Sequence, residues 1–300
     1  MSAHVSTVVP MNDGGSYDGL VDTVNWAADG HGKRKFADGS EYTGDWRQGL
    51  MEGRGTMTFG HNSPTLDSYK GEWKANKFHG YGVLLYRTYH QPPSTRAHYT
   101  GSYKMGKMDG QGHRAGPDGD SYKGGWKEDK RHGAGIQIWA DGSQYNGEWY
   151  DDRRHGTGTY HRKDGLVYQG DWENNKYHGH GRCWSIKEGS YVGEWVEGVK
   201  HGEGSLVYTD GSRFDGEWRD NKPHGRGILV KPGQESVESY WVDGTPSGGK
   251  KAPQNIHYPW DLNDNPQDPP ASNAAKSSQS TPGALLKQVQ RVLNLGTDCS

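Results

Sequence analysis

The 300-residue sequence contains few of the aliphatic residues that build an ordinary protein core, and its mean hydropathy is −1.07. The set AVILMFWYC supplies 30% of the residues, whereas apolar residues including glycine make up roughly 45–50% of a typical globular protein. A large net charge is also missing, because 35 Lys and Arg residues nearly balance 37 Asp and Glu residues. This balance argues against disorder driven by charge repulsion, and against general nucleic-acid binding, which needs a basic surface.

Cysteines and long apolar runs are scarce as well. The two cysteines, Cys183 and Cys299, are too few for a disulfide framework and fit a reducing compartment. The longest apolar run covers residues 83–86, far short of the ~20 residues that span a membrane. The N-terminus has neither the basic nor the apolar region of a secretory signal peptide. We therefore expect a cytoplasmic protein without a membrane span.

Glycine and aromatic residues are abundant instead, with 47 Gly, 12 Trp and 18 Tyr, and they recur in a fixed pattern. A Tyr-x-Gly-x-Trp motif followed by His-Gly-x-Gly occurs in eight clear copies, with a partial copy at each end. Successive copies start 25, 27, 30 and then six times 23 residues apart, which is typical of a repeat protein. The residues that we assign to the repeated pattern in the clearest copies are Tyr42, Gly44, Trp46, Tyr69, Gly71, Trp73, Tyr122, Trp126, Tyr145, Trp149, Tyr168, Trp172, Tyr191, Trp195, Phe214 and Trp218.

Each copy has the residue spacing of a β-hairpin. Tyr, Gly and Trp stand at positions i, i+2 and i+4, so they lie on one face of a strand. Linkers rich in Asn, Asp, Lys and Gly, and Asp-Gly pairs such as 141–142, suit the turns. We predict an all-β fold, an elongated single-layer antiparallel meander of hairpins in which each ring covers a glycine of the neighbouring strand. This aromatic ladder would form the core.

The motifs resemble the MORN (membrane occupation and recognition nexus) repeat, whose pattern is Tyr-x-Gly-x-Trp-x-x-Gly-x-x-His-Gly-x-Gly. Departures from that pattern are Glu52 and Asp109 at the His position, Tyr103 at a Trp position and Phe214 at a Tyr position. The resemblance implies a twisted single sheet of the stand-alone repeat type. It also implies a role at a cytoskeletal structure such as a cilium, a flagellum or the cell cortex, and some proteins of this family bind phosphoinositides.

Composition divides the chain into five segments. One of them, over residues 281–296, is expected to form a short helix, and its apolar stripe includes Leu285, Val289 and Val292. Because so short a helix is marginal alone in water, it needs a surface, which is either the open edge of its own sheet or a partner protein. The segments are a flexible N-terminus over 1–16, the repeat sheet over 17–248, a disordered linker over 249–280, a short amphipathic helix over 281–296 and a tail over 297–300.

Two sets of polar side chains recur at motif positions, namely the His of His-Gly-x-Gly and the acidic residue before Trp. Copies of each lie about 10 Å apart for strands spaced ~4.8 Å. Zinc ligands and proton-sharing carboxylates must be much closer, so we predict no metal, no cofactor and no catalytic residue, and a solvated face for the acids. A metal site shared between two chains stays open. The residues are His79, His132, His155, His178, His201 and His224, and Asp45, Glu72, Glu148, Asp171, Glu194 and Glu217.

Two insertions, over residues 61–68 and 87–98, enlarge consecutive turns at one edge of the predicted sheet. We predict that they form a partner-binding lobe, and neutral variation of the loops is the alternative. The candidate contact residues are Tyr89, Pro92, Pro93 and Arg96.

Basic residues at the hairpin tips indicate a second kind of partner. Lysines close to an anionic membrane contribute about 1 kcal/mol each to binding. The candidates for lipid binding are Lys74, Lys77, Lys104, Lys107 and Lys130.

The sequence contains no recognisable catalytic set and no phosphate-cradling loop. We therefore expect a non-enzymatic scaffold or adaptor for other proteins, and the identity of the partner and the formation of a homodimer stay open. The alternative is a peripheral membrane protein that binds phosphoinositides or other anionic lipids through its basic hairpin tips.

Overall fold

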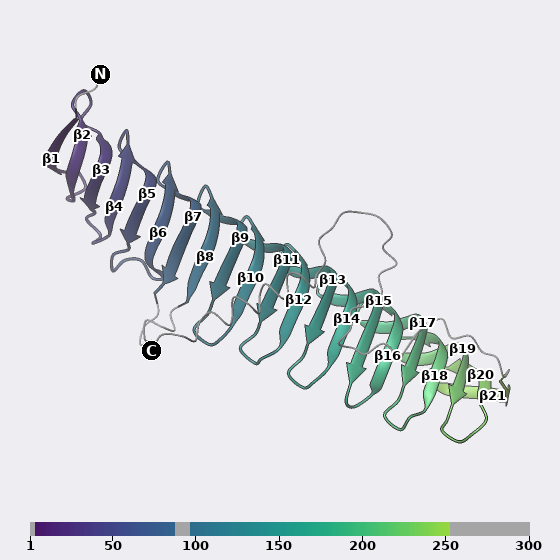
Figure 1. Ribbon diagram of the computed structural model, residues 1–300. Coiled ribbons are helices and arrows are strands. Elements are labelled where there is room, and N and C mark those ends of the chain that lie inside the picture. Colours follow the sequence, from purple (N-terminus) through teal and green to yellow (C-terminus); the bar gives the residue numbers. More distant parts are fainter. Residues whose placement is uncertain (1–3, 88–96, 253–300) are drawn as a thin grey trace, which may run out of the picture. The chain divides into compact units, whose positions relative to one another are not determined.

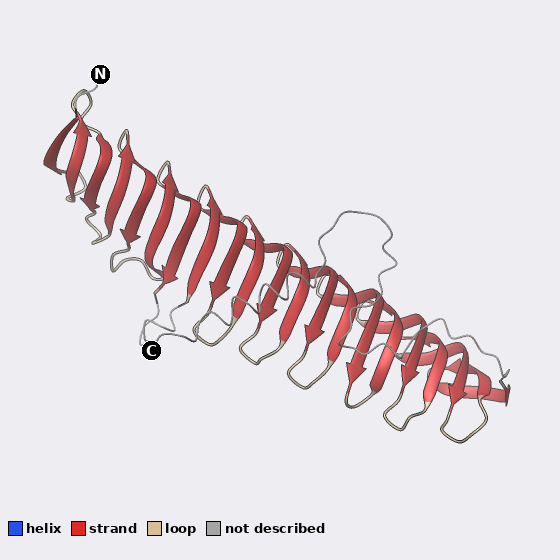
Figure 2. Cartoon of the chain, viewed as in Figure 1, coloured by secondary structure: helices blue, strands red, loops and turns tan. Residues whose placement is uncertain are grey.

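The computed structural model describes residues 4–87 and 97–252, which contain 21 β-strands and no helix (Figure 2). These residues accordingly include no helix that is long and apolar enough to cross a membrane. The strands are β1 (His4–Pro10), β2 (Ser16–Asp22), β3 (Ala28–Lys35), β4 (Glu41–Arg47), β5 (Leu50–Thr58), β6 (Leu66–Lys74), β7 (Lys77–Tyr86), β8 (His98–Lys104), β9 (Lys107–Ala115), β10 (Ser121–Lys127), β11 (Lys130–Ile138), β12 (Gln144–Tyr150), β13 (Arg153–His161), β14 (Val167–Glu173), β15 (Lys176–Ser185), β16 (Gly189–Val196), β17 (Val199–Val207), β18 (Arg213–Arg219), β19 (Lys222–Val230), β20 (Val237–Val242) and β21 (Thr245–Lys251).

All 21 strands belong to one open antiparallel sheet. Each strand pairs with the next one in the sequence, from β1 with β2 through to β20 with β21, so the connections never cross (Figure 1). The Tyr-x-Gly-x-Trp motifs lie on even-numbered strands and the His-Gly-x-Gly motifs on odd-numbered strands. The predicted all-β meander of hairpins is therefore confirmed.

The core is a continuous row of rings on one face of the sheet. The ring of Tyr145 lies 5.2 Å from that of Trp149 in its own strand and 5.1 Å from that of Trp172 in the next hairpin, with interplanar angles of 89° and 80°. The Tyr145 hydroxyl donates to the Glu148 carbonyl at 3.0 Å, and the Trp149 indole N–H donates to the Gly135 carbonyl at 3.3 Å. The rings are thus packed edge to face and their polar atoms are paired, which buried Tyr and Trp side chains require.

Glycine makes room for each ring. Gly147 of β12 faces Gly158 of β13, and the Tyr145 ring lies directly over Gly158. A Cβ atom at Gly158 would stand 2.4 Å from the Tyr145 hydroxyl oxygen and 2.6 Å from the ring carbons. No residue with a Cβ atom can occupy this position unless the ring moves.

The hairpins from β2–β3 to β18–β19 each contain a β-bulge beside the glycine pair. In the hairpin of β12 and β13, Gly147 pairs with Gly158 but Glu148 already pairs with His155. The Glu148 carboxylate accepts the backbone N–H of Thr157 at 3.1 Å, so the acidic residue binds the bulged strand. The alternation of the sequence predicts only that the acidic motif residues lie on the face opposite the rings. The structure shows in addition that their carboxylates bind backbone N–H groups of the bulged strand. The equivalent bonds join Asp45 to Arg54, Glu72 to Tyr81, Asp171 to His180, Glu194 to Glu203 and Glu217 to Arg226.

Departures from the motif are accommodated in the ladder. Tyr103, in place of Trp, is 4% exposed, and its buried hydroxyl has no hydrogen-bond partner in the described part of the chain. Phe214, in place of Tyr, is fully buried without a hydroxyl.

The ends of the sheet differ from the expected segments. At the N-terminus, residues 4–10 form β1 within the segment 1–16 that was expected to be flexible, and at the other end β21 runs past residue 248. The expected helix lies outside the described residues.

The buried tyrosines predict the response to alkali. Burial raises the pKa of Tyr17 and of Tyr177 to about 12, from the ordinary value of 10.0, because the charged phenolate is poorly solvated there. A raised folded-state pKa means that this stability is fully present below pH 10 and is lost as the pH rises towards 12. We expect tyrosinate absorbance and loss of near-ultraviolet circular dichroism to appear together in that window. Tyrosinate formation near pH 10 in a sheet that stays folded would contradict the assignment of buried phenols.

Candidate interaction surfaces

The ladder face carries variable positions beside the rings. The residue before each His-Gly-x-Gly motif pairs with the Trp of the same hairpin, and it is arginine in two consecutive hairpins, at Arg131 and Arg154. Around these arginines Trp139 and Tyr160 are only partly buried. The two hairpins therefore present both cations and accessible ring surface on one face.

Arg131 is neutralised. Its guanidinium carbon lies 4.1 Å from the centre of the Trp149 ring, and Nε donates to an Asp152 carboxylate oxygen at 3.0 Å. The other guanidinium nitrogens donate to the Gln137 side-chain oxygen at 3.0 Å and to the Asp152 carbonyl at 3.1 Å. This cation thus has both a counter-charge and a nearly complete set of acceptors.

Arg154 lies in the same kind of site, but no counter-charge lies beside it in the part of the chain that the structure describes. Its guanidinium carbon is 4.3 Å from the centre of the Trp172 ring, 5.0 Å from Tyr160 and 6.0 Å from Trp139. Within the described residues its guanidinium makes one hydrogen bond, to the Asn175 carbonyl at 3.1 Å, and no ion pair. Burial among the rings lowers the pKa of Arg154. We call Arg154, Trp139, Tyr160 and Trp172 the Arg154 cluster.

One side chain makes the difference between the two arginines. Asp152 and Asn175 occupy equivalent hairpin tips, and each accepts the backbone N–H of its arginine, Arg131 or Arg154, at 2.9 Å. Both tip residues have a positive φ, 67° and 71°. Only the carboxylate of Asp152 can balance a guanidinium charge. The sequence contains this clue as an Asp-to-Asn change 23 residues along, but it becomes visible only when the tip is seen to contact the preceding hairpin.

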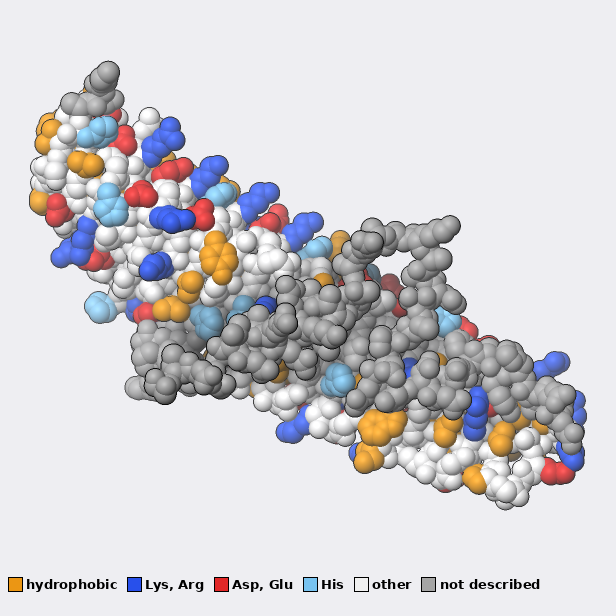
Figure 3. All heavy atoms as spheres, viewed as in Figure 1, with side chains coloured by type: hydrophobic (Ala, Val, Ile, Leu, Met, Phe, Trp, Pro, Cys, Tyr) orange, Lys and Arg blue, Asp and Glu red, His pale blue; other side chains and the backbone are white. Residues whose placement is uncertain are grey.

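The hairpin tips form a second row of charges. Tip lysines pair with acidic residues 21 positions later, as in Lys107 with Glu128 at 3.6 Å and Lys130 with Asp151 at 3.4 Å. Among the residues predicted to bind lipid, these two are therefore neutralised. The other three have no carboxylate within 4.0 Å in residues 4–87 and 97–252, and Figure 3 shows basic side chains along this rim in the N-terminal half. They are Lys74, Lys77 and Lys104.

One motif histidine lies close to two carboxylates. Potential ligand atoms of Glu173, His178 and Glu197 all fall within 4.8 Å of one another. The sequence prediction considered only the distances between equivalent motif histidines, so it could not find a group made of one histidine and two glutamates. The Lys176 ammonium already lies 2.5 Å from a Glu197 oxygen and supplies a positive charge there. A metal ion at this place would have to compete with that lysine.

Arg87, the first residue of the second predicted insertion, contacts the segment that holds the first. The Arg87 guanidinium donates to the carbonyls of Phe59, at 2.8 Å, and Gly60, at 3.1 Å, and the Arg87 backbone N–H donates to the Thr65 carbonyl at 2.7 Å. Arg87 thus ties the start of the second insertion to the segment 59–65. All of the predicted partner-binding residues lie outside the described residues, namely Tyr89, Pro92, Pro93, Arg96, Leu285, Val289 and Val292.

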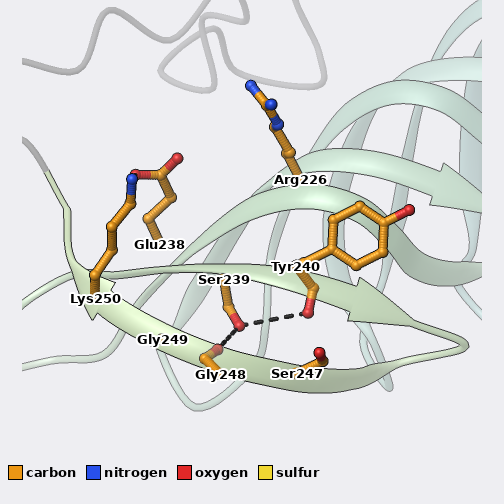
Figure 4. A pocket seen from close by; sticks show the side chains of 8 residues that line it. All are labelled: Arg226, Glu238, Ser239, Tyr240, Ser247, Gly248, Gly249 and Lys250. Carbon is orange, nitrogen blue, oxygen red and sulfur yellow. Dashed lines mark hydrogen bonds and ion pairs between the residues drawn. The ribbon is translucent and has the colours of Figure 1, made fainter.

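A cavity of about 470 Å³ lies at the C-terminal end of the sheet and is lined by residues of β19, β20 and β21 (Figure 4). Lys250 pairs there with Glu238 at 3.4 Å, and the Ser239 hydroxyl donates to the Gly248 carbonyl. The lining therefore offers a serine whose hydroxyl is bound to backbone and an acid neutralised by a lysine. It contains no nucleophile paired with a base, so it does not indicate a catalytic site.

Comparison with known proteins identifies the repeat. The MORN repeat family matches nine segments that together cover more than half of the sequence, so the chain belongs to this family. The family is a structural repeat and not an enzyme family. A comparison with curated proteins gives no match. The matched segments are 27–41, 42–60, 69–91, 99–121, 122–144, 145–167, 168–187, 191–213 and 214–234.

The charge difference at the two tips is directly testable. Replacing Asn175 by Asp should give Arg154 the partner that Arg131 has, and should raise the free energy of unfolding by about 0.2–1 kcal/mol, as partly exposed ion pairs do. Asp152→Asn should lower it by a similar amount. Denaturant titrations at low and high salt measure both effects, which salt should reduce. Equal stability of the parent and both variants would show that neither guanidinium responds to its tip.

Proposed function

We propose that this protein is a non-enzymatic interaction scaffold that holds a partner polypeptide on its ladder face, at the Arg154 cluster. The observation that carries the proposal is a guanidinium set among aromatic rings, with no carboxylate beside it in the described residues. Membership of a structural repeat family agrees with an adaptor role.

The chemistry of the cluster favours a carboxylate as the ligand. A guanidinium presents parallel N–H donors that match the two oxygens of a carboxylate, and such bonds are stronger than those between neutral groups. The partly buried rings of Trp139 and Tyr160 offer apolar area next to the charge. Trp, Tyr and Arg are also the residues that most often dominate the binding energy of protein interfaces. An acidic side chain followed by an apolar one would satisfy both parts of the cluster.

The experiment is proximity labelling in the native cell with the full-length protein. Arg154→Gln should remove a defined set of neighbours, because it deletes the charge while the glutamine retains part of the packing. Arg153→Gln is the matched control, since this exposed neighbour bonds only the Asn174 side chain, at 3.1 Å, among the described residues. Identical neighbours for the parent and for Arg154→Gln would refute the proposal.

The proposal extends to cellular location, where the support is the family resemblance alone. We propose that the scaffold works at a cytoskeletal structure such as a cilium, a flagellum or the cell cortex. The same labelling experiment tests this, because the neighbours would be enriched in components of such a structure. A neighbour set drawn evenly from the cytosol would contradict it.

Binding to an anionic membrane is the second candidate, favoured by the tip lysines Lys74, Lys77 and Lys104, which have no acidic partner among the described residues. Sedimentation with vesicles containing phosphatidylserine should then fall when these three are changed to Gln, and should fall with added salt. Changing Lys107 and Lys130 to Gln should have less effect, because both already pair with acids. Failure of the parent protein to sediment with such vesicles at low salt would eliminate this candidate.

A further inference from the structure

The two outer strands of the sheet differ in how readily a strand of another chain could pair with them. The outer strands are β1 and β21, which lie at opposite ends of the row (Figure 1). All seven residues of β21 are exposed, and they include Pro246, two glycines and the lysines Lys250 and Lys251. Proline and lysine on an edge strand are the features that prevent pairing with another chain. The end formed by β21 is therefore blocked.

Strand β1 has little of this protection. Its sequence, HVSTVVP, contains no lysine, arginine or acidic residue and is rich in β-branched side chains. Val5 is 46% exposed and Val8 is 66% exposed, and Figure 3 shows apolar side chains on the surface at this end. Pro10 removes one backbone donor, at the last position only. Six residues before it can take part in a backbone ladder with another strand.

Strand β1 is also held rigidly in place. It pairs with β2 over its full length, with Val5 opposite Val21 and Val9 opposite Tyr17. Tyr17 and Val21 are each 1% exposed, so β1 covers the first rung of the ring ladder. Within residues 4–87 and 97–252 no strand pairs with the other edge of β1. This edge is therefore presented in extended form, and little conformational entropy remains to be lost when a second strand pairs with it.

We propose that β1 pairs with β1 of a second copy of this chain, antiparallel about a two-fold axis at Thr7. This register sets Val5 opposite Val9, Ser6 opposite Val8, and Thr7 opposite itself. Opposed residues lie on the same face of an antiparallel pair, and a shift by one residue would exchange the faces. With Thr7 at the axis, the ladder faces of both copies continue on the same side of the joined sheet.

The sequence of β1 is self-complementary in this register. Val5 and Val9 meet on the ladder face, a Thr–Thr pair lies at the axis, and no like charges oppose each other. The one titratable residue, His4, lies 3.7 Å from Asp29 of its own chain and would face Pro10 of the partner. A two-fold contact of this kind uses the same surface on both copies, so assembly stops at the dimer while β21 stays blocked.

The test measures solution mass by sedimentation equilibrium with the full-length protein. The parent should reach twice the mass of one chain as its concentration rises. Thr7→Lys and Thr7→Glu should each sediment as monomers, because they place like charges directly opposite each other at the axis. An equimolar mixture of the two variants should recover the doubled mass, since opposite charges then meet. Thr245→Lys on β21 is the matched control and should remain dimeric.

The folding of each charge variant is checked by circular dichroism, and Val8→Lys, at a more exposed position of β1, replaces Thr7→Lys if that variant unfolds. A parent that stays monomeric up to its solubility limit would overturn the proposal. A dimer that Thr245→Lys dissociates and Thr7→Lys does not would overturn it as well. So would folded Thr7→Lys and Thr7→Glu variants whose mixture remains monomeric.

Discussion

The close contact between a tyrosine ring and a glycine of the facing strand is the constraint on which this structure depends. A single sheet has no second layer to cover it, so its core must be built within one face. Tyr145 does this by lying over Gly158 and by touching the indoles of Trp149 and Trp172 edge to face. Because each ring bridges two hairpins, the core grows by one repeat at a time. The scarcity of aliphatic residues is a direct consequence.

Much of this architecture could be predicted from the sequence, because the motif fixes side-chain direction. The spacing of Tyr145, Gly147 and Trp149 places all three on one face, and the glycine-rich partner motif explains what the ring covers. Features that depend on the bulge or on contacts between repeats could not be predicted in this way. The pairing of Glu148 with the Thr157 N–H needs the bulge, and the isolation of Arg154 depends on a tip 21 residues further on. Strand β1 carries no motif, so periodicity alone could not find it.

Within each repeat, different positions serve stability and recognition. The ring and glycine residues form the core, so these positions can vary little to create a binding site. The positions between them vary, and it is there that Arg131 and Arg154 differ in charge balance and that Lys74 and Lys130 differ in pairing. Membership of the repeat family thus accounts for the sheet, while the individual surface residues must account for what this chain binds.

The sign of one mutational effect tests the ring-over-glycine core most directly. In an ordinary strand, replacing glycine by alanine raises stability by about 0.5–1 kcal/mol, since glycine loses more conformational freedom on folding. At Gly158 the added Cβ would collide with the Tyr145 ring, 2.4 Å from its hydroxyl oxygen. The free energy of unfolding of Gly158→Ala, measured by denaturant titration, should therefore fall below that of the parent. A value equal to or above the parent's would contradict the account.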